Sequence, residues 1–331
     1  MNIKTTRAAA VGAMALALTL TGCASGSVDG SGSTAPASGS AGLTKVNYGL
    51  FPSSTVAALQ VAIDKGYFKK EGIDLKLVVG AGSSAAQLPA LTTGQLDFML
   101  ASPVTALTAS TQGLDVRIVD GFTQNDPSTV EDSTAVVVGA GSSIKRARDL
   151  AGKKVSVNAL GGIGEIGIRA AVARDGGDPS KITFVQLSFP EVAAQLEAGH
   201  IDAGMAGSPF MQQVMAKGGR VVSDFIHDTG LGKNELVTIA GGKVVNGDPE
   251  LVKRFDAAMD AALPFLAKNN DLVRAAMPAA LGTAPAAAEK TKLSLYNAAI
   301  SEPTIQLFAD LLVKYDIVST KPDVDKVIWK P

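Results

Sequence analysis

Residues Gly152 to Phe210 read GKKVSVNALGGIGEIGIRAAVARDGGDPSKITFVQLSFPEVAAQLEAGHIDAGMAGSPF. The segment alternates short β-branched and apolar runs with helical stretches that Gly and Pro interrupt. The predicted strands span 154–157, 182–187 and 201–205, and the predicted helices span 166–174 and 190–197. Strands that alternate with helices of this length favour a parallel sheet with crossover helices, whose ligands bind at the carboxyl ends of the strands. The segment therefore predicts an α/β fold with its functional groups in strand-to-helix loops.

Part of this unit is repeated earlier in the chain. Leu91-Thr-Thr-Gly-Gln-Leu-Asp97, followed by Ser102-Pro103, matches Leu196-Glu-Ala-Gly-His-Ile-Asp202, followed by Ser208-Pro209. Each copy predicts a helix that ends at a Gly with positive φ, a short strand that opens with an Asp, and a second helix with Ser as N-cap and Pro at its first position. The repeat predicts two similar lobes that enclose a cleft. Convergence of short helix–strand–helix signals is the alternative interpretation.

The N-terminus has the organisation of a secretory signal. Two basic residues precede an apolar run over residues 8–20, and the tetrapeptide Leu-Thr-Gly-Cys23 that follows resembles a bacterial lipobox. We therefore expect a signal peptide over residues 1–22, a lipid on Cys23, and a flexible linker over 23–42 that is rich in Gly, Ser and Ala. Such a protein is exported and lipid-anchored to the outer face of the cell membrane. The alternative is a free thiol within a signal segment.

The composition argues against several function classes. The formal net charge is −1 and the chain has 1 Trp, so we expect no nucleic-acid partner. Cys23 is the only cysteine, and His200 and His227 are the only histidines, with no cluster at metal-ligand spacing. Neither a G-x-S-x-G nucleophile elbow nor a G-x-G-x-x-G fingerprint is present. We therefore expect no catalytic residues, no metal and no cofactor.

From residue 43 onward the chain has the composition of a globular protein, and several of its motifs resemble one family. They are Gly66-Tyr-Phe-Lys-Lys-Glu-Gly-Ile73, Leu91 to Asp97, Arg148 to Val155, Leu196 to Asp202 and Pro209-Phe210. In this order they resemble solute-binding proteins of bacterial ABC importers, in the group that serves nitrate, taurine, alkanesulfonates and the pyrimidine precursor of thiamine. One departure is Ser208, because relatives often have Glu before the Pro-Phe pair. The substitution removes a negative charge near the expected cleft.

The resemblance implies a periplasmic-binding-protein-like fold of type II, with two discontinuous lobes joined by a hinge. The expected lobes are 43–131 plus 223–331 for lobe one and 132–222 for lobe two, with hinge segments near 126–134 and 222–228. The resemblance also implies a small-molecule ligand and, as partners, the permease and ATPase subunits of an ABC importer; we expect a monomer. Beyond residue 248 the apolar spacing predicts helices over 250–268, 272–280, 286–295 and 303–315, packed against lobe one.

The candidate ligand-binding residues lie in the turns that face the expected cleft. They are Phe51, Ser53, Ser54, Gly82, Ser83, Ser102, Pro103, Asn158, Gly161, Gly162, Phe189, Glu191 and Ser208. These turns offer hydroxyl groups and helix N-terminal N–H groups, which favour acceptors and anions, whereas the alternative is that the hydroxyls only cap their helices. Glu165 and Glu191 lie in first helical turns, where they complement the helix dipole, and Glu165 is spaced to pair with Arg169 on an exposed face.

The ligand that we expect is a small organic solute, namely a sulfonate, a taurine-like molecule or a carboxylate. No Arg or Lys lies within the turns, so no guanidinium clamp is available for a strongly anionic ligand. A neutral heterocycle such as a pyrimidine is the alternative ligand. Two other function classes remain open, an enzyme of pyrimidine synthesis and a tethered sensor that binds the same solute.

Overall fold

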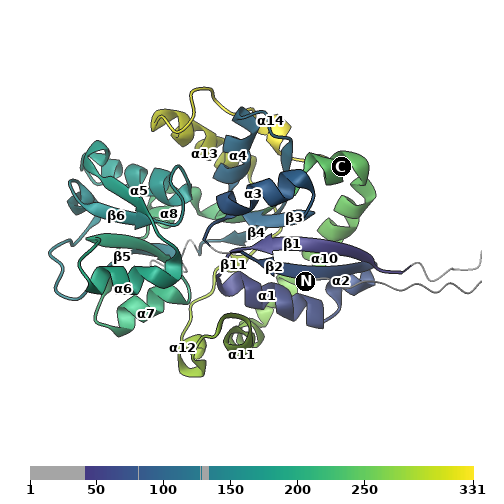
Figure 1. The fold of residues 1–331 in the computed structure, drawn as a ribbon, viewed down its shortest axis with the longest axis horizontal. Helices are drawn as coiled ribbons and strands as arrows, with labels where there is room; N and C mark the ends of the chain where they lie inside the picture. Colours follow the sequence, from purple (N-terminus) through teal and green to yellow (C-terminus); the bar gives the residue numbers. More distant parts are fainter. Residues whose placement is uncertain (1–41, 81, 127, 129–133) are drawn as a thin grey trace, which may run out of the picture. The chain divides into compact units, whose positions relative to one another are not determined.

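The protein folds around two β-sheets, seen in a computed structural model that describes residues 42–80, 82–126, 128 and 134–331 (Figure 1). The expected signal peptide, the linker up to residue 41 and the lipidation site Cys23 lie outside these ranges. The first sheet is six-stranded with the order β11-β4-β10-β3-β1-β2, and the second is five-stranded with the order β7-β6-β8-β5-β9. Within the described ranges, none of the helices is both long and apolar enough to cross a lipid bilayer.

The strands and helices alternate as the sequence predicts. The strands are β1 Thr44–Leu50, β2 Ile73–Val79, β3 Phe98–Ala101, β4 Val116–Gln124, β5 Thr134–Val138, β6 Lys154–Val157, β7 Thr183–Gln186, β8 Ala203–Gly207, β9 Arg220–Ser223, β10 Leu236–Gly241 and β11 Leu295–Tyr296. The helices are α1 Ser54–Asp64, α2 Tyr67–Lys70, α3 Ser84–Thr93, α4 Pro103–Thr111, α5 Ile163–Arg174, α6 Val192–Glu197, α7 Phe210–Ala216, α8 Phe225–Thr229, α9 Gly242–Gly247, α10 Pro249–Lys268, α11 Asn270–Leu281, α12 Pro285–Glu289, α13 Glu302–Lys314 and α14 Val324–Val327. Short 3-10 helices span Ala147–Leu150, Pro179–Lys181, Phe189–Glu191 and Leu231–Asn234.

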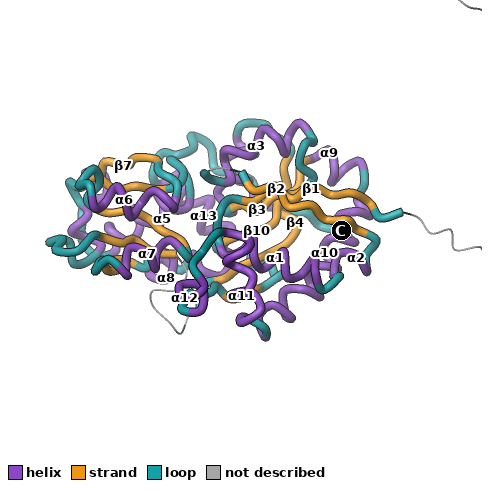
Figure 2. The backbone as a smooth tube through the Cα atoms, turned by 60° about the horizontal axis from the view of Figure 1, so that its bottom comes forward, coloured by secondary structure: helices purple, strands orange, loops and turns teal. Residues whose placement is uncertain are grey.

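The first sheet has a parallel half and an antiparallel half. β1 pairs in parallel with β2 and β3, and β10 pairs antiparallel with β3 and β4. Helices α1, α2, α10 and α11 lie over one face, and α3 lies over the other (Figure 2). Phe255 of α10 stacks on Phe98 with ring centroids 4.1 Å apart and on Tyr48 at 5.7 Å. Such aromatic pairs add about 0.5–1.5 kcal/mol each beyond the burial of their area, so α10 is a principal cover of this sheet.

The second sheet follows the same plan with different helices. β6 pairs in parallel with β7 and β8, while β5 pairs antiparallel with β8 and β9. Its strands are rich in buried Val and Ala, as expected for a sheet covered on both faces. Helix α8 crosses α5 closely at Gly167, where an added Cβ would lie 2.4 Å from the ring of Phe225. Any larger residue at position 167 would force these two helices apart.

The repeated motif has the same geometry at the start of both copies. Gly94 and Gly199 end their helices at φ values of 79° and 68°, as predicted. The Asp97 carboxylate accepts a hydrogen bond from the backbone N–H of Asn47 at 2.8 Å, and Asp202 accepts one from Lys154 at 2.8 Å. Each Asp therefore joins the start of its own strand to the neighbouring parallel strand, at the middle of β1 in the first sheet and at the first residue of β6 in the second.

The second copy departs from the prediction at its end. Ser102 is the N-cap of α4 and Pro103 is its first residue, as expected. In the other copy α7 begins only at Phe210, with Pro209 at the N-cap position, so the predicted capping role of Ser208 is wrong. The carbonyl of Ser208 instead accepts a hydrogen bond from the backbone N–H of Ser54 at 3.3 Å.

The C-terminal part contains one clear correction. The helix expected over 286–295 ends at Glu289, and Leu295–Tyr296 forms strand β11, which pairs antiparallel with the end of β4. This pairing places Tyr296 against the ring of Phe122 at 6.2 Å, a tertiary contact that overrides local helix preference. Further along, Ile328 bridges to Ile118, and the Trp329 N–H donates to the Ile118 carbonyl at 2.9 Å. The chain thus ends on the first sheet.

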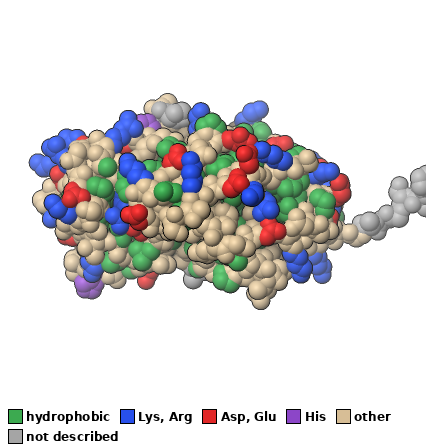
Figure 3. Space-filling model, turned by 90° about the horizontal axis from the view of Figure 1, so that it is seen from above, with side chains coloured by type: hydrophobic (Ala, Val, Ile, Leu, Met, Phe, Trp, Pro, Cys, Tyr) green, Lys and Arg blue, Asp and Glu red, His purple; other side chains and the backbone are tan. Residues whose placement is uncertain are grey.

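The first sheet draws its strands from residues 44–124 and 236–296, and the second draws its strands from 134–223. The division into lobes at 43–131 plus 223–331 and at 132–222 stays a prediction. Part of the expected hinge, residues 127 and 129–133, lies outside the described residues. On the face seen in Figure 3, basic and acidic side chains are interspersed, without a continuous basic stripe.

Candidate functional site

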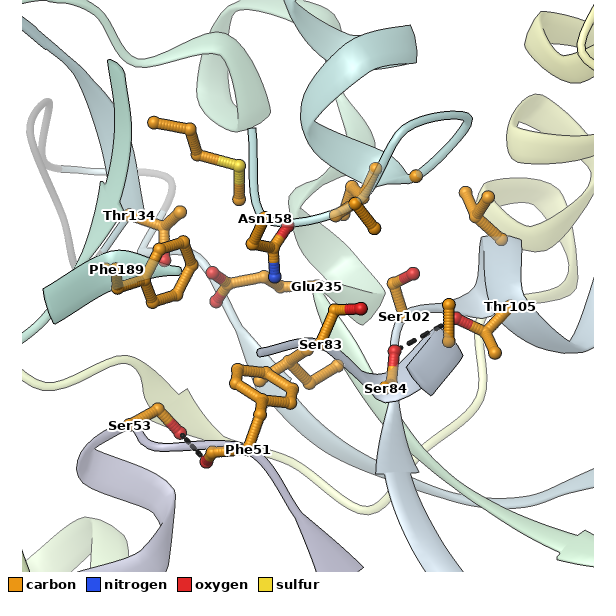
Figure 4. Close-up of a pocket in the computed structure, with 18 of the residues that line it drawn as sticks. Phe51, Ser53, Ser83, Ser84, Ser102, Thr105, Thr134, Asn158, Phe189 and Glu235 are labelled. Atoms are coloured by element: carbon orange, nitrogen blue, oxygen red, sulfur yellow. Dashed lines mark hydrogen bonds between the residues drawn. The ribbon is translucent and has the colours of Figure 1, made fainter. Parts of the chain in front are cut away.

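A cavity of about 260 Å³ lies where loops of both sheets meet (Figure 4). Its walls come from the turns that follow β1, β3, β6 and β8, together with the first residues of α3 and one face of α4. In a parallel sheet these carboxyl-terminal turns lie on one edge, so the fold brings residues distant in sequence into one cavity. The position of the cavity follows from the strand order of the two sheets.

Most of the expected binding residues line this cavity. They are Phe51, Ser53, Ser54, Ser83, Ser102, Asn158, Gly161, Gly162, Phe189 and Ser208. Their convergence requires both sheets, because the first five belong to the loops of the first sheet and the others belong to the loops of the second. Whether they contact a ligand stays a prediction.

The remaining expected residues do not line the cavity. Glu191 accepts hydrogen bonds from the N–H and the hydroxyl of Ser188, at 2.9 and 2.5 Å, so its carboxylate caps its own loop. The hydroxyl bond, reinforced by the backbone bond, holds the pKa of Glu191 below its ordinary value. Gly82 and Glu191 border a separate hollow beside the cavity. Pro103 is buried as the first residue of α4.

The hydroxyl groups of the cavity fall into paired and unpaired sets. Ser53 is bonded to Thr55 at 2.6 Å, and Ser84 is bonded to Thr105 at 3.0 Å. Ser83, the N-cap of α3, is only 2% exposed, and its hydroxyl has no hydrogen-bond partner within the described part of the chain. A buried hydroxyl without a partner costs about 1–3 kcal/mol, so a further hydrogen bond to Ser83 would stabilise the protein.

Two aromatic rings from different sheets meet at the cavity. Phe51 follows β1 and Phe189 follows β7, and their centroids lie 6.3 Å apart in an edge-to-face arrangement. Figure 4 shows the Asn158 amide and the Ser83 hydroxyl in the same space above the Phe51 ring. The cavity therefore combines an apolar aromatic wall with a small number of polar groups, the usual composition of a small-molecule site.

The structure adds lining residues that the sequence patterns did not indicate. Glu235, directly before β10, is 4% exposed and lies on the cavity wall. Its Oε2 accepts hydrogen bonds from the hydroxyls of Ser294 at 3.1 Å and Thr123 at 3.4 Å. Ser294 was expected inside a helix, and the segment before β10 was expected only to return the chain to lobe one. The one available signal was an acidic residue directly before the apolar run 236–241.

Glu235 is the only ionisable side chain among the described residues that line the cavity. The expected pair of Glu165 with Arg169 forms at 2.7 Å, but Glu165 is buried, so the expected exposed face is wrong. Arg169 also donates to the Pro179 carbonyl, away from the cavity. Among the described residues, no group of three or more His, Cys, Asp or Glu is placed to hold a metal ion.

The chain matches one protein family and several solved structures. The profile of the family described as NMT1/THI5 like matches residues 53–273. The alkanesulfonate-binding protein SsuA from Xanthomonas axonopodis pv. citri, bound to MOPS, is 18% identical with a TM-score of 0.74, over 88% of this chain and 100% of that one. No protein of curated function matches the chain in sequence.

Two further structures are similar over comparable lengths. The periplasmic nitrate-binding protein NrtA from Synechocystis PCC 6803 is 15% identical with a TM-score of 0.72, over 86% of each chain. The product of the Candida albicans gene CA3427, described as having the generic periplasmic binding protein fold, is 15% identical with a TM-score of 0.68, over 87% of this chain and 97% of that one. These likenesses confirm the predicted two-lobed, type II periplasmic-binding-protein fold.

Proposed function

This chain belongs to the NMT1/THI5-like family, and from that premise we propose that it is the extracytoplasmic solute-binding component of an ABC importer. The observation that carries the proposal is the cavity of about 260 Å³, whose walls come from loops of both sheets. A ligand held there contacts both sheets at once, so it stabilises the closed arrangement by its differential affinity. The similarity to sulfonate-binding and nitrate-binding proteins supports the same class.

The proposed ligand is a small sulfonate, taurine-like molecule or carboxylate. Its acceptor oxygens would bond the Ser83 hydroxyl and the N–H groups at the start of α3, because a helix N-terminus carries partial positive charge. A neutral heterocycle such as a pyrimidine is the second candidate. The Phe51 and Phe189 rings and the Asn158 amide favour that candidate, since they provide an aromatic wall and paired donor and acceptor groups.

We propose binding without turnover. The described lining residues include neither His nor Cys, the side chains most often used as general base or thiol nucleophile. A tethered sensor would bind the same solute, and it differs from a transport component only in its partners. Uptake of labelled solute by cells that lack the protein separates these two roles.

The proposed partners and location follow from the family and the N-terminal sequence. The protein is exported, anchored through lipid on Cys23, and delivers its solute as a monomer to permease and ATPase subunits. Labelling with a fatty-acid analogue tests the anchor, because replacing Cys23 with Ser should abolish the label and release the protein from membranes. Retention of label on that variant would overturn the proposed anchor.

A thermal-shift screen of the full mature chain in detergent tests the function. The panel holds sulfonates, taurine, nitrate, carboxylates and pyrimidines. At a hundredfold excess over Kd a ligand stabilises the protein by about 2.7 kcal/mol, which raises Tm by roughly 4 °C for a chain of this size. A shift with one chemical class, without consumption of the compound, supports a binding protein. Consumption of the compound would indicate an enzyme, and no shift with any class would remove the ligand assignment.

A further inference from the structure

We propose that Glu235 selects the ligand of this cavity by accepting hydrogen bonds from an ammonium or other N–H donor group on it. The inference deepens the proposed solute-binding function and rests on it. It separates amine-bearing ligands from plain anions, a distinction that the fold alone does not make.

The first argument is the position of Glu235. It lies on the wall of the cavity and is held by three segments that meet there, since its own N–H donates to the Thr123 carbonyl at 3.1 Å and its Oε2 accepts from the Thr123 and Ser294 hydroxyls. A side chain fixed at several points loses little conformational freedom when a ligand arrives. Glu235 is therefore pre-organised as a hydrogen-bond acceptor.

The second argument is the charge of the cavity. Glu235 is the only ionisable group among the described lining residues, so the described lining offers no basic side chain. The sequence at the internal positions 81, 127 and 129–133 also contains no Lys, Arg or His. A carboxylate oxygen on the wall accepts a hydrogen bond from an ammonium or amino group, whereas a ligand that is only anionic offers it no donor.

The third argument is the polarity of a second group on the cavity wall. The Ser83 hydroxyl, without a partner in the described chain, stands at the N-terminus of α3 and suits an acceptor atom. The N-terminus of α1 is engaged, because the Ser54 N–H donates to the Ser208 carbonyl. The cavity wall thus offers an acceptor at Glu235 and a hydroxyl donor at Ser83. A ligand that carries both a nitrogen donor and acceptor oxygens or ring nitrogens matches both.

The test uses pairs of compounds that differ only in an amine. Taurine is compared with ethanesulfonate, β-alanine with propionate, and 4-aminopyrimidine with pyrimidine, by titration calorimetry on the full mature chain in detergent. We expect the amine-bearing member of at least one pair to bind at least tenfold more tightly than its partner. The proposal is overturned if the members bind equally, if the amine-free members bind more tightly, or if amine-free compounds bind while no amine does.

Variants then assign the preference to Glu235. In Glu235→Gln the preference for the amine should fall to below threefold, and Glu235→Asp, which keeps the charge, should restore part of it. Glu191→Gln is the matched control, because Glu191 caps Ser188 outside the cavity, and it should keep the full preference. Circular dichroism and Tm of each variant establish folding, and the wild-type comparison stands even if Glu235→Gln does not fold.

Failure of the inference differs from failure of the proposed function. A tight ligand without any N–H donor, found in the broad screen, would leave the binding function intact and overturn the role of Glu235. An amine preference that survives in folded Glu235→Gln would do the same. Absence of every ligand from the broad screen would instead count against the proposed function.

Discussion

Gly94 and Asp97 in the first sheet correspond to Gly199 and Asp202 in the second. Both glycines end a helix with positive φ, and both aspartates accept a backbone hydrogen bond at 2.8 Å from the neighbouring parallel strand. Beyond β3 and β8 the two copies diverge, since Ser102 occupies the N-cap position of α4 while the Ser208 carbonyl accepts a hydrogen bond from the Ser54 N–H, which follows β1 of the first sheet. The two copies thus share their geometry at the Gly and Asp positions and differ at Ser102 and Ser208, where the chain reaches the cavity.

The interiors of the two sheets also differ, and Asp120 on β4 gives the largest expected effect. Asp120 is 2% exposed, one of its oxygens has no partner within the described chain, and no Asp or Glu occurs in strands β5 to β9. Burial, reinforced by Asp256 and Asp260, raises the pKa of Asp120 well above its ordinary value. Asp120→Asn should therefore stabilise the protein at neutral pH by about 2 kcal/mol, because the amide never carries the buried charge and each unit of pKa shift corresponds to about 1.4 kcal/mol.

The stability difference between the wild type and Asp120→Asn should depend on pH. Because the pKa of Asp120 is higher in the folded protein than in the unfolded chain, folding favours the protonated form. The contribution of Asp120 to stability is fully present below the unfolded pKa, about 3.9, and is lost as pH rises through the folded value. Urea unfolding of both proteins from pH 4 to 8 should show a difference that grows with pH. A difference that does not change with pH would contradict the prediction.

Replacing each motif glycine with Ala tests whether the copies are equivalent. A left-handed backbone conformation costs a residue with a Cβ about 1–2 kcal/mol, so Gly94→Ala and Gly199→Ala should each lower the free energy of unfolding by that amount. Gly94→Ala should cost slightly more, because its Cβ would lie 3.0 Å from the Lys243 side chain. Gly247→Ala, where φ is not positive and nothing lies within 4 Å, is the control. Equal effects in all three variants would show that the turn geometry is unimportant.

Replacing Asp97 or Asp202 tests whether solvent exposure changes how much the shared hydrogen bond contributes to stability in each copy. Asp97 is half-buried and Asp202 is exposed, so water replaces the lost carboxylate more easily at Asp202. Asp97→Ala should lower the free energy of unfolding by about 1 kcal/mol and Asp202→Ala by about half of that. Denaturant unfolding under one set of conditions measures both. A larger loss at Asp202 would mean that the second sheet depends on this joint more than the first.

Replacing Ser102 or Ser208, the serines that follow β3 and β8, should give the smallest effect, which we expect in ligand affinity. Ser102→Ala should weaken binding of the ligand found in the screen by about 1 kcal/mol, or about fivefold. Ser208→Ala should weaken it less, about twofold, because the Ser208 hydroxyl already accepts a bond from Gln212 at 3.2 Å. Calorimetry measures both. Unchanged affinity in both variants would show that the site is placed wrongly.

Local sequence predicted the elements that depend on local patterns. The alternation over residues 152–210 and the motif glycines indicate strands and helix ends directly, because φ and side-chain periodicity are properties of neighbouring residues. The cavity loops followed from the strand order that the family resemblance implies. Most of the expected lining residues therefore lie on one cavity.

Residues that reach the cavity through pairing of strands distant in sequence could not be predicted from local patterns. Ser294 reaches Glu235 because β11 pairs with β4, which joins Leu295 to Gln124 across about half of the chain, whereas local propensity favoured a helix there. Glu191 was misplaced for the opposite reason, since its carboxylate satisfies an amide three residues earlier. Helix propensity and capping rules describe residues that are close in sequence. They do not include the energy of pairing two strands that are distant in sequence.

Trp329, bonded through its N–H to Ile118, bears on how unfolding of this protein can be observed. The chain has 1 Trp and 4 Tyr, at positions 48, 67, 296 and 315, and none of them lies between residues 134 and 223. Tryptophan fluorescence therefore reports on the part of the chain around the first sheet, whereas Tyr315 lies near Arg169 of α5 and also senses the second part. Separate melting of the second sheet would escape tryptophan fluorescence and appear in far-ultraviolet dichroism. Coincidence of the fluorescence and dichroism curves is thus a direct test of whether the two sheets unfold together.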